Sequence, residues 1–184
     1  MLEETIAAVM AALNRHKVPF IFFGMQAINI HLGRERRETF GTEDSDFLFD
    51  LAISAPTDIL KILKMMSFPE PVFVVWKEPG RSITVFDGWK WKSPRLSGAG
   101  TFSICTPEGY YHLDLAFGDT GIPFQEVWKK SVRIRYFGVP IRLAHKDHLL
   151  EMKRYAGREK DHQLLVRLKL DERSGKARRG MRGK

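Results

Sequence analysis

Near its N-terminus the chain reads FIFFGMQA over residues 20–27. Four large apolar residues in a row are typical of a short buried strand, and the apolar positions at Ala27, Ile28 and Leu32 predict a helix over residues 25–32. Gly24 lies at the turn between them. A glycine there lets the backbone approach a ligand closely, and the free N–H groups at the start of a helix favour phosphate. The stretch therefore predicts a strand, a tight turn and a helix suited to hold a phosphate group.

A second stretch, over residues 43–53, is predicted to be a strand that begins with acidic side chains. Because side chains alternate along a strand, Asp44 and Asp46 are expected to share one face. Two neighbouring carboxylates repel each other, and a divalent cation would remove that repulsion. The alternative is that both side chains face solvent at the end of the strand.

A third carboxylate lies on a strand predicted over residues 110–117. Its apolar face carries Leu113, Leu115 and Phe117, and its polar face carries His112 and Asp114. A neighbouring strand that sets Asp114 beside the first two carboxylates would bring three acidic groups next to the glycine turn. Such a site suits Mg²⁺ and a nucleoside triphosphate.

The other elements follow from the same patterns. Helices are expected over residues 2–16, from an N-cap at Thr57, over 146–155 and over 158–170, with strands over 72–76, 81–86, 132–136 and 139–143 and a loop over 89–100. This order favours an α+β or mixed α/β class, a mixed sheet flanked by helices with a helical C-terminal part. Residues 1–172 are expected to form one domain, helical over about 145–172, followed by a basic tail over 173–184.

Charge and cysteine content narrow the classes of protein further. The net charge is +8, but residues 173–184 carry six basic and no acidic residues, so the rest is nearly neutral. That tail is expected to be disordered and suited to RNA or DNA phosphates, or to act only as a solubilising terminus. The single cysteine, Cys105, excludes an internal disulfide and favours a reducing, cytoplasmic compartment. No apolar run is long enough to span a membrane, and the acidic start predicts no signal peptide.

The segment from Gly24 to Asp46, with TEDSD over residues 42–46, resembles the nucleotidyltransferase superfamily that includes DNA polymerase beta. Within it, the match is to small bacterial proteins of the AbiEii-toxin-like and uncharacterised nucleotidyltransferase branch. Their pattern is a strand, Gly-Gly-x-Ala, a basic loop and Thr-x-Asp-hydrophobic-Asp, with a third carboxylate on a later strand. They also carry a lysine on one C-terminal helix and Gly-Arg-x-Lys-Asp at the next, matched here by Lys153 and by GREKD over residues 157–161. The resemblance spans roughly residues 5–170.

This resemblance implies a nucleotidyltransferase-like fold and an enzyme that moves a nucleoside monophosphate from an NTP to a hydroxyl, with Mg²⁺ or Mn²⁺ as cofactor. It implies that Asp44, Asp46 and Asp114 bind the metal and that Asp114 also helps to deprotonate the acceptor. Gly24 and the backbone of Met25 are implied to bind phosphate. Lys153 and Lys160 are implied to contact phosphate or to neutralise charge.

The acceptor and the partners stay open. Relatives act on an RNA end such as that of tRNA, on a protein or on a small molecule, and a toxin-like enzyme would need an antitoxin partner. Met25 replaces the second glycine of the family, where its side chain is expected to crowd the triphosphate. Ser45 replaces an apolar residue, and a buried serine there is expected to make the strand irregular. Both departures favour the alternative of a catalytically silent protein that binds a partner or nucleic acid, and a plain nucleic-acid-binding domain is a further alternative.

Other features admit a functional and a structural interpretation. His145 and His148 are spaced to bind a metal, but no third ligand is evident. Arg158 and Asp161 are expected to be structural, with Asp161 paired to a basic residue. The interleaved aromatic and basic residues over 89–92 suit either base stacking or a packed loop. The basic loop over 34–37 suits either contact with the triphosphate or plain solvation.

Overall fold

The computed structural model describes residues 2–33, 44–66, 71, 73–78, 83–88, 99–105, 112–118 and 120–168. Within these ranges the strands are β1 (Phe20–Phe23), β2 (Ser45–Phe49), β3 (Phe73–Lys77), β4 (Ile83–Asp87), β5 (Gly100–Cys105), β6 (His112–Phe117), β7 (Val132–Tyr136) and β8 (Val139–Leu143). The helices are α1 (Leu2–Arg15), α2 (Gly24–His31), α3 (Pro56–Met65), α4 (Phe124–Lys130) and α5 (Lys146–Ala156), and residues 159–168 are also helical.

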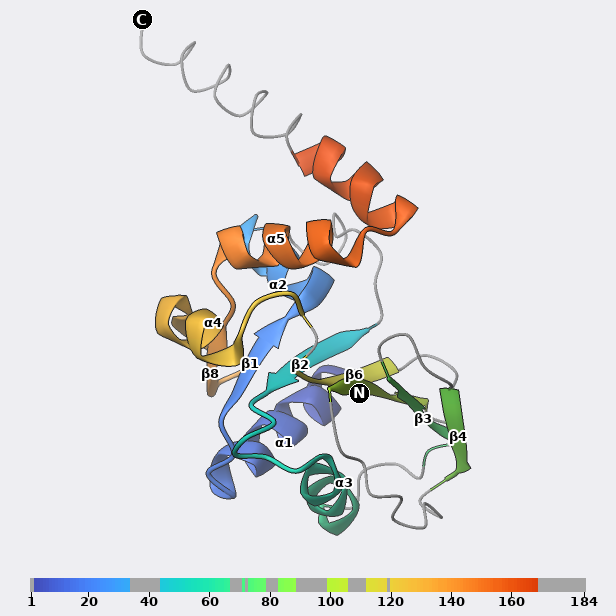
Figure 1. Ribbon diagram of the computed structural model, residues 1–184. Helices are drawn as coiled ribbons and strands as arrows, with labels where there is room; N and C mark the ends of the chain where they lie inside the picture. The colour runs from blue at the N-terminus through green and yellow to red at the C-terminus, as the bar shows by residue number, and fades with distance from the viewer. Residues whose placement is uncertain are drawn as a thin grey trace, which may run out of the picture.

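The strands form one mixed sheet in the order β4-β3-β5-β6-β2-β1-β8-β7, with helices packed around it (Figure 1). β1 is antiparallel to β2 and parallel to β8, and β2 is parallel to β6. This arrangement confirms the expected class, a mixed sheet flanked by helices and followed by a helical C-terminal part. None of the described helices has the length and apolar character to cross a membrane.

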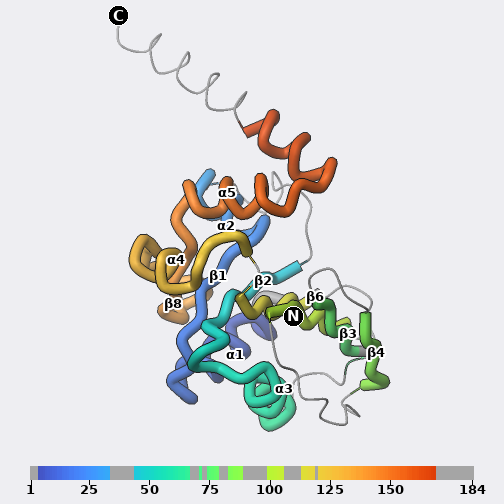
Figure 2. The backbone as a smooth tube through the Cα atoms, viewed as in Figure 1, coloured from blue at the N-terminus to red at the C-terminus, as the bar shows by residue number. Residues whose placement is uncertain are grey.

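The C-terminal helices lie at the end of β1 where α2 begins. In Figure 2 the tube runs from β8 into α5 and then into the helix over residues 159–168, above the end of β1 and the start of β2. α5 packs against α2, whereas α1 packs against α3 at the other side of the molecule. One end of β1 is therefore enclosed by helices that come from opposite ends of the chain.

Aromatic side chains fill the core because the central strands are buried on both faces. Phe49 of β2 stacks on Phe117 of β6 with 5.1 Å between ring centroids, and Trp76 of β3 lies 4.5 Å from Phe102 of β5. All four side chains are buried. At Gly100, a Cβ would lie 2.5 Å from the Trp76 ring, so only glycine allows the start of β5 to approach β3 this closely.

The largest differences between the predicted and the observed elements are at four places. β5 was not expected, although Phe102 and Ile104 alternate with smaller residues; α4 was not expected either. The strand predicted over residues 43–53 ends at Phe49, since Asp50 Oδ1 accepts a hydrogen bond from the Ala52 N–H at 3.0 Å and starts a turn. α3 has its N-cap at Ala55 rather than Thr57, because Pro56 occupies the first helical position.

Candidate active site

The glycine turn and the first acidic strand meet at the end of β1. Phe23, the last residue of β1, is the register partner of Asp46 on β2. Gly24 follows with φ +75°, and a Cβ placed on Gly24 would lie 1.8 Å from Asp46 Oδ2. The Asp46 carboxylate therefore lies directly against the turn, in the space that any larger residue at position 24 would occupy.

The second carboxylate reaches the same place through strand pairing. β2 and β6 are parallel, and Asp46 and Asp114 are register partners across them. Directly opposed residues on neighbouring strands point to the same face of a sheet, so the two carboxylates share one face. Asp44 lies two residues before Asp46, outside β2, and its charge also acts on Asp46. The structure thus brings together Asp46 and Asp114, which the sequence places on separate strands.

The surroundings of Asp46 strongly raise the pKa of its carboxyl group. Burial raises its pKa most, the charges of Asp114 and Asp44 raise it further, and Lys153 and Arg158 oppose the rise, so that the pKa of Asp46 reaches about 7 instead of 3.8. At neutral pH the ionised pair is therefore unfavourable without a compensating cation.

Two cations, Lys153 on α5 and Arg158 just after it, lie beside the carboxylates, and a buried carboxylate holds both of them. Lys153 Nζ lies 3.0 Å from Asp161 Oδ1, and Arg158 Nε lies 2.6 Å from Asp161 Oδ2. The Asp161 side chain is only 2% exposed. Burial raises the pKa of Asp161, but hydrogen bonds from Arg158 and Lys153 outweigh that effect and lower it overall. The predicted pairing of Asp161 with a basic residue is confirmed, and it fixes the direction of both cations.

Asp46, Asp114, Lys153 and Arg158 line one cavity of about 620 Å³, a size that suits a small-molecule ligand. Arg158, expected to be structural, lines it as well as pairing with Asp161. Thr101, Thr120 and Tyr155 carry no sequence signal for this site, because nothing in their spacing indicates which neighbours they meet. The complete lining is Phe23, Gly24, Asp46, Thr101, Asp114, Ala116, Thr120, Leu149, Met152, Lys153, Tyr155, Ala156 and Arg158.

Other candidate residues lie elsewhere. Lys160 is exposed and does not line the cavity. Met25 packs against the hydrophobic core and does not line the cavity. The crowding expected from its side chain is therefore not seen in the cavity. Ser45 is buried, but β2 pairs in regular register through it, with Ser45 opposite Leu113. The expectation of an irregular strand is therefore wrong, because regular backbone pairing continues even though Ser45 Oγ has no hydrogen-bond partner among the described residues.

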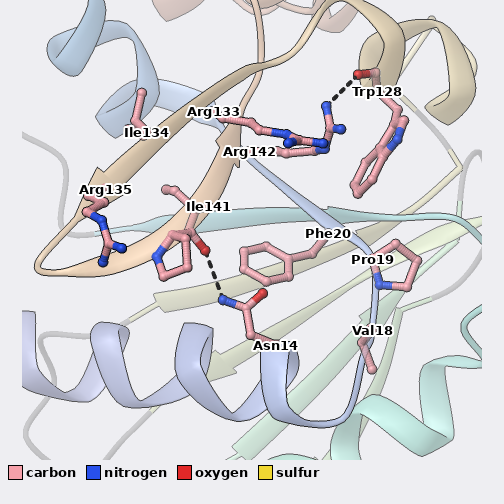
Figure 3. Close-up of a pocket in the computed structure, with 11 residues that line it drawn as sticks. Asn14, Val18, Pro19, Phe20, Trp128, Arg133, Ile134, Arg135, Ile141 and Arg142 are labelled. Carbon is pink, nitrogen blue, oxygen red and sulfur yellow. Dashed lines mark hydrogen bonds between the residues drawn. The ribbon is translucent and has the colours of Figure 1, made fainter.

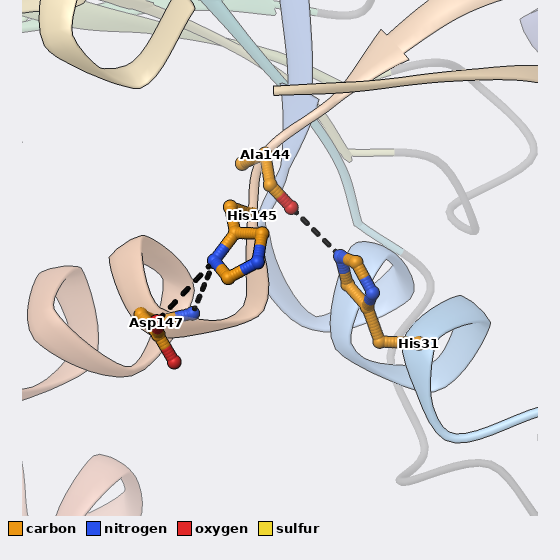
Figure 4. Close-up of polar contacts among 4 residues, drawn as sticks. All are labelled: His31, Ala144, His145 and Asp147. Carbon is orange, nitrogen blue, oxygen red and sulfur yellow. Dashed lines mark hydrogen bonds and ion pairs between the residues drawn. The ribbon is translucent and has the colours of Figure 1, made fainter. Parts of the chain in front are cut away.

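Of the two histidines that the sequence singles out, His145 caps a helix. His145 Nδ1 accepts a hydrogen bond from the Asp147 N–H at 3.3 Å and so caps α5, while His31 Nε2 on α2 donates to the Ala144 carbonyl at 2.8 Å (Figure 4). His148 is buried. Among the described residues no three His, Cys, Asp or Glu side chains are placed closely enough to hold a metal ion by themselves. The basic loop over 34–37, the aromatic stretch over 89–92 and the tail over 173–184 lie outside the described residues.

The pH dependence of stability tests the electrostatics of Asp46. Since the pKa of Asp46 is raised on folding, the folded state binds its proton more tightly, and stability falls as pH rises from about 4 to 7. We expect metal-free Asp46→Asn to match the wild-type chain at pH 4 and to be more stable at pH 8, by up to about 4 kcal/mol. Asp161 stays ionised across this range because its pKa is lowered. Urea unfolding at both pH values measures the difference, and equal stability at pH 8 would contradict it.

Comparisons with known proteins bear on the fold. No protein-family model matches the chain, and no curated protein matches its sequence. A crystal structure of ANT(2″)-Ia in complex with adenylyl-2″-tobramycin is similar over 90% of this chain and 86% of that one, with 18% identity and a TM-score of 0.53. A solution structure of antibiotic-resistance factor ANT(2″)-Ia aligns over 99% and 97% of the two chains, with 14% identity and a TM-score of 0.46. The mixed sheet, its flanking helices and the first of these similarities show that the chain has a nucleotidyltransferase-like fold.

Proposed function

We propose that the chain is a nucleotidyltransferase that moves a nucleoside monophosphate from an NTP to a hydroxyl acceptor. The observation that carries this proposal is the register pairing of Asp46 with Asp114 beside the Gly24 turn, in a cavity that also receives Lys153 and Arg158. Paired carboxylates, a glycine turn at the start of a helix and fixed cations in one cavity suit phosphoryl chemistry, which depends on positioning and charge neutralisation.

The donor set fits Mg²⁺, or Mn²⁺, as a cofactor. Mg²⁺ is commonly held by one or two carboxylates together with substrate phosphates, so Asp46 and Asp114, with Asp44 nearby, would suffice without a third fixed protein ligand. The raised pKa of Asp46 supports this assignment, because a nearby cation would favour the ionised form of a buried carboxylate. When bound, the ion would neutralise charge on the triphosphate.

The other residues of the site would bind the phosphates, accept a proton and neutralise charge. The backbone at Gly24 and Met25, at the N-terminus of α2, would hold the β- and γ-phosphates, and α2 has no acidic residue in its first turn to repel them. Asp114 would accept the proton of the acceptor hydroxyl. The acceptor oxygen then bonds to the α-phosphorus, the bond from that phosphorus to pyrophosphate breaks, and Lys153 and Arg158 balance the charge that develops on the phosphates.

A small molecule is the acceptor that we propose first. The similar structure of ANT(2″)-Ia contains adenylyl-2″-tobramycin, a small molecule that carries an adenylyl group. An RNA end such as that of tRNA, or a protein hydroxyl in a toxin–antitoxin setting, would be the acceptor if the experiment below labels it instead. We propose a cytoplasmic location, which the single cysteine favours.

Label transfer tests the proposed activity. The purified chain is incubated with Mg²⁺ and each α-³²P-labelled NTP, with aminoglycosides, total RNA or cell lysate as acceptors. We expect label to move to one acceptor class, to need Mg²⁺ and to be lost in Asp114→Asn. Thin-layer chromatography and gels separate the three classes of product.

Two results would contradict the proposal. Transfer that Asp114→Asn leaves unchanged would remove Asp114 from the site. Absence of transfer to every acceptor, together with absence of Mg²⁺-dependent NTP binding by calorimetry, would favour a catalytically silent protein with this fold.

A further inference from the structure

A second cavity lies at the opposite end of β1, away from the candidate active site. It has a volume of about 530 Å³ and lies between the end of α1, the start of β1, the β7–β8 hairpin and α4 (Figure 3). It shares no lining residue with the first cavity. The lining is Asn14, Val18, Pro19, Phe20, Trp128, Arg133, Ile134, Arg135, Pro140, Ile141 and Arg142.

β1 and β8 pair in parallel, with Phe22 opposite Leu143. Pro140, Ile141 and Arg142 of β8 line the cavity, as do Val18, Pro19 and Phe20 at the start of β1. Asn14 of α1 bridges the gap, with its side-chain amide donating to the Pro140 carbonyl at 2.8 Å. The hydrogen bond from Asn14 therefore links two walls of the cavity, α1 and β8.

Two arginines oppose each other on one wall. Arg133 of β7 and Arg142 of β8 are register partners across the hairpin, an arrangement that is destabilising for like charges. Arg142 is fixed, since its guanidinium lies 4.0 Å from the Trp128 ring centroid and donates to the Trp128 carbonyl at 3.2 Å and to Ser131 Oγ at 2.9 Å. Figure 3 shows both guanidinium groups directed toward Trp128, above the ring of Phe20.

The charge on this wall is not balanced by the protein around it. The lining contains three arginines and no acidic residue. Among the described residues, none of the three arginines forms an ion pair with a carboxylate; Arg135 donates to the Gly138 carbonyl at 2.9 Å. Burial and the charge of Arg133 both lower the pKa of Arg142. Two like charges beside apolar walls, one of them held in place by Trp128 and Ser131, favour an anion from solution.

We propose that this cavity binds a small organic anion, with its carboxylate or phosphate between Arg133 and Arg142 and its apolar body against Val18, Pro19 and Phe20. The volume is in the range of small-molecule sites, and Arg side chains match the geometry of both anionic groups. Because the two cavities have separate linings, this binding does not depend on the proposed transferase activity.

Calorimetric titration of the full chain in EDTA tests the site with four probes: phenyl phosphate, benzoate, inorganic phosphate and neutral benzyl alcohol. We expect one of the two aromatic anions to bind at a single site at concentrations up to about 10 mM, and which one binds identifies the anionic group. Inorganic phosphate and benzyl alcohol should each bind at least about tenfold more weakly. Inorganic phosphate lacks the apolar body, and benzyl alcohol lacks the anionic group.

Arg133→Gln is the decisive variant, and Lys130→Gln is its control. Arg133 is exposed, so its loss should leave the fold intact and, by removing like-charge repulsion, should not lower the melting temperature. We expect aromatic-anion binding to weaken about tenfold in Arg133→Gln. Lys130→Gln removes the same charge from an exposed position outside the cavity and should leave binding unchanged.

Three results would overturn the proposal. These are absence of saturable binding by both aromatic anions, equally tight binding of benzyl alcohol, and binding that Arg133→Gln leaves unchanged. The last result would place the anion at another site, such as the cavity lined by Lys153 and Arg158.

Discussion

Replacing Asp46 with Asn is expected to lower the rate of nucleotidyl transfer by about a thousandfold. Asp46 lies against the Gly24 turn, is paired in register with Asp114, and has a pKa raised to about 7 by its surroundings. Asn keeps the size of the side chain and removes the negative charge that would attract a cation. Initial rates of label transfer at saturating NTP and acceptor measure the effect.

The control for this variant is Asp58→Asn. Asp58 makes an ion pair with Lys61 on the surface of α3, and both side chains are 62% exposed. The same chemical change there should leave the rate within about twofold of the wild-type rate, since exposed pairs contribute little. Because metal-free Asp46→Asn is expected to be more stable than the wild-type chain at pH 8, unfolding would not explain a lost activity. A transfer rate of Asp46→Asn above about a tenth of the wild-type rate would exclude Asp46 from the proposed chemistry.

Replacing Gly24 with Ala is the second change with a large expected effect. The added Cβ would lie 1.8 Å from Asp46 Oδ2 and 2.4 Å from Asp46 Cγ, so the carboxylate must move away from the turn. The backbone at Gly24 also has φ +75°, which an alanine adopts only with strain. We expect transfer activity to fall about a hundredfold, since displacement of a reacting group by 1 Å can cost that much.

Gly138→Ala separates backbone strain from the clash. Gly138 has φ +78°, close to that of Gly24, but a Cβ there has no neighbouring atom within 4 Å. Both variants should lose about 1–2 kcal/mol of stability in urea unfolding from the strained backbone. Only Gly24→Ala should also lose activity. Similar rates in the two variants would show that the Gly24 turn does not position Asp46.

Local patterns predicted several elements well. β1 and the hairpin of β7 and β8 have the predicted boundaries, and α2 begins at the glycine turn. A run of large apolar residues and a two-residue Phe-Gly turn can each be recognised from a few consecutive residues, so their elements are predictable from sequence. β5 and α4 were not predicted. β5 pairs with both β3 and β6, and its approach to β3 depends on Gly100, which accommodates Trp76.

The candidate site shows the same division. From sequence, Gly24, Asp46, Asp114 and Lys153 were assigned to one site, partly by residue pattern and partly by family resemblance. Their convergence depends on β2 and β6 being parallel neighbours, although the chain between them contains β3, β4 and β5. No local pattern encodes that pairing. The cavity position of Tyr155 and the pairing of Asp161 with two cations depend on how the C-terminal helices return to the sheet.

The sequence by itself determined the class of fold, the glycine turn and the types of side chain available for chemistry, because these follow from short-range periodicity and residue chemistry. Only the tertiary structure decided the register that opposes Asp46 to Asp114, the raised pKa of Asp46 and the position of Met25 away from the cavity. It alone also revealed the second cavity, where Arg133 faces Arg142. These features depend on distances between residues far apart in the chain, and such distances are fixed by packing of the whole sheet and its helices.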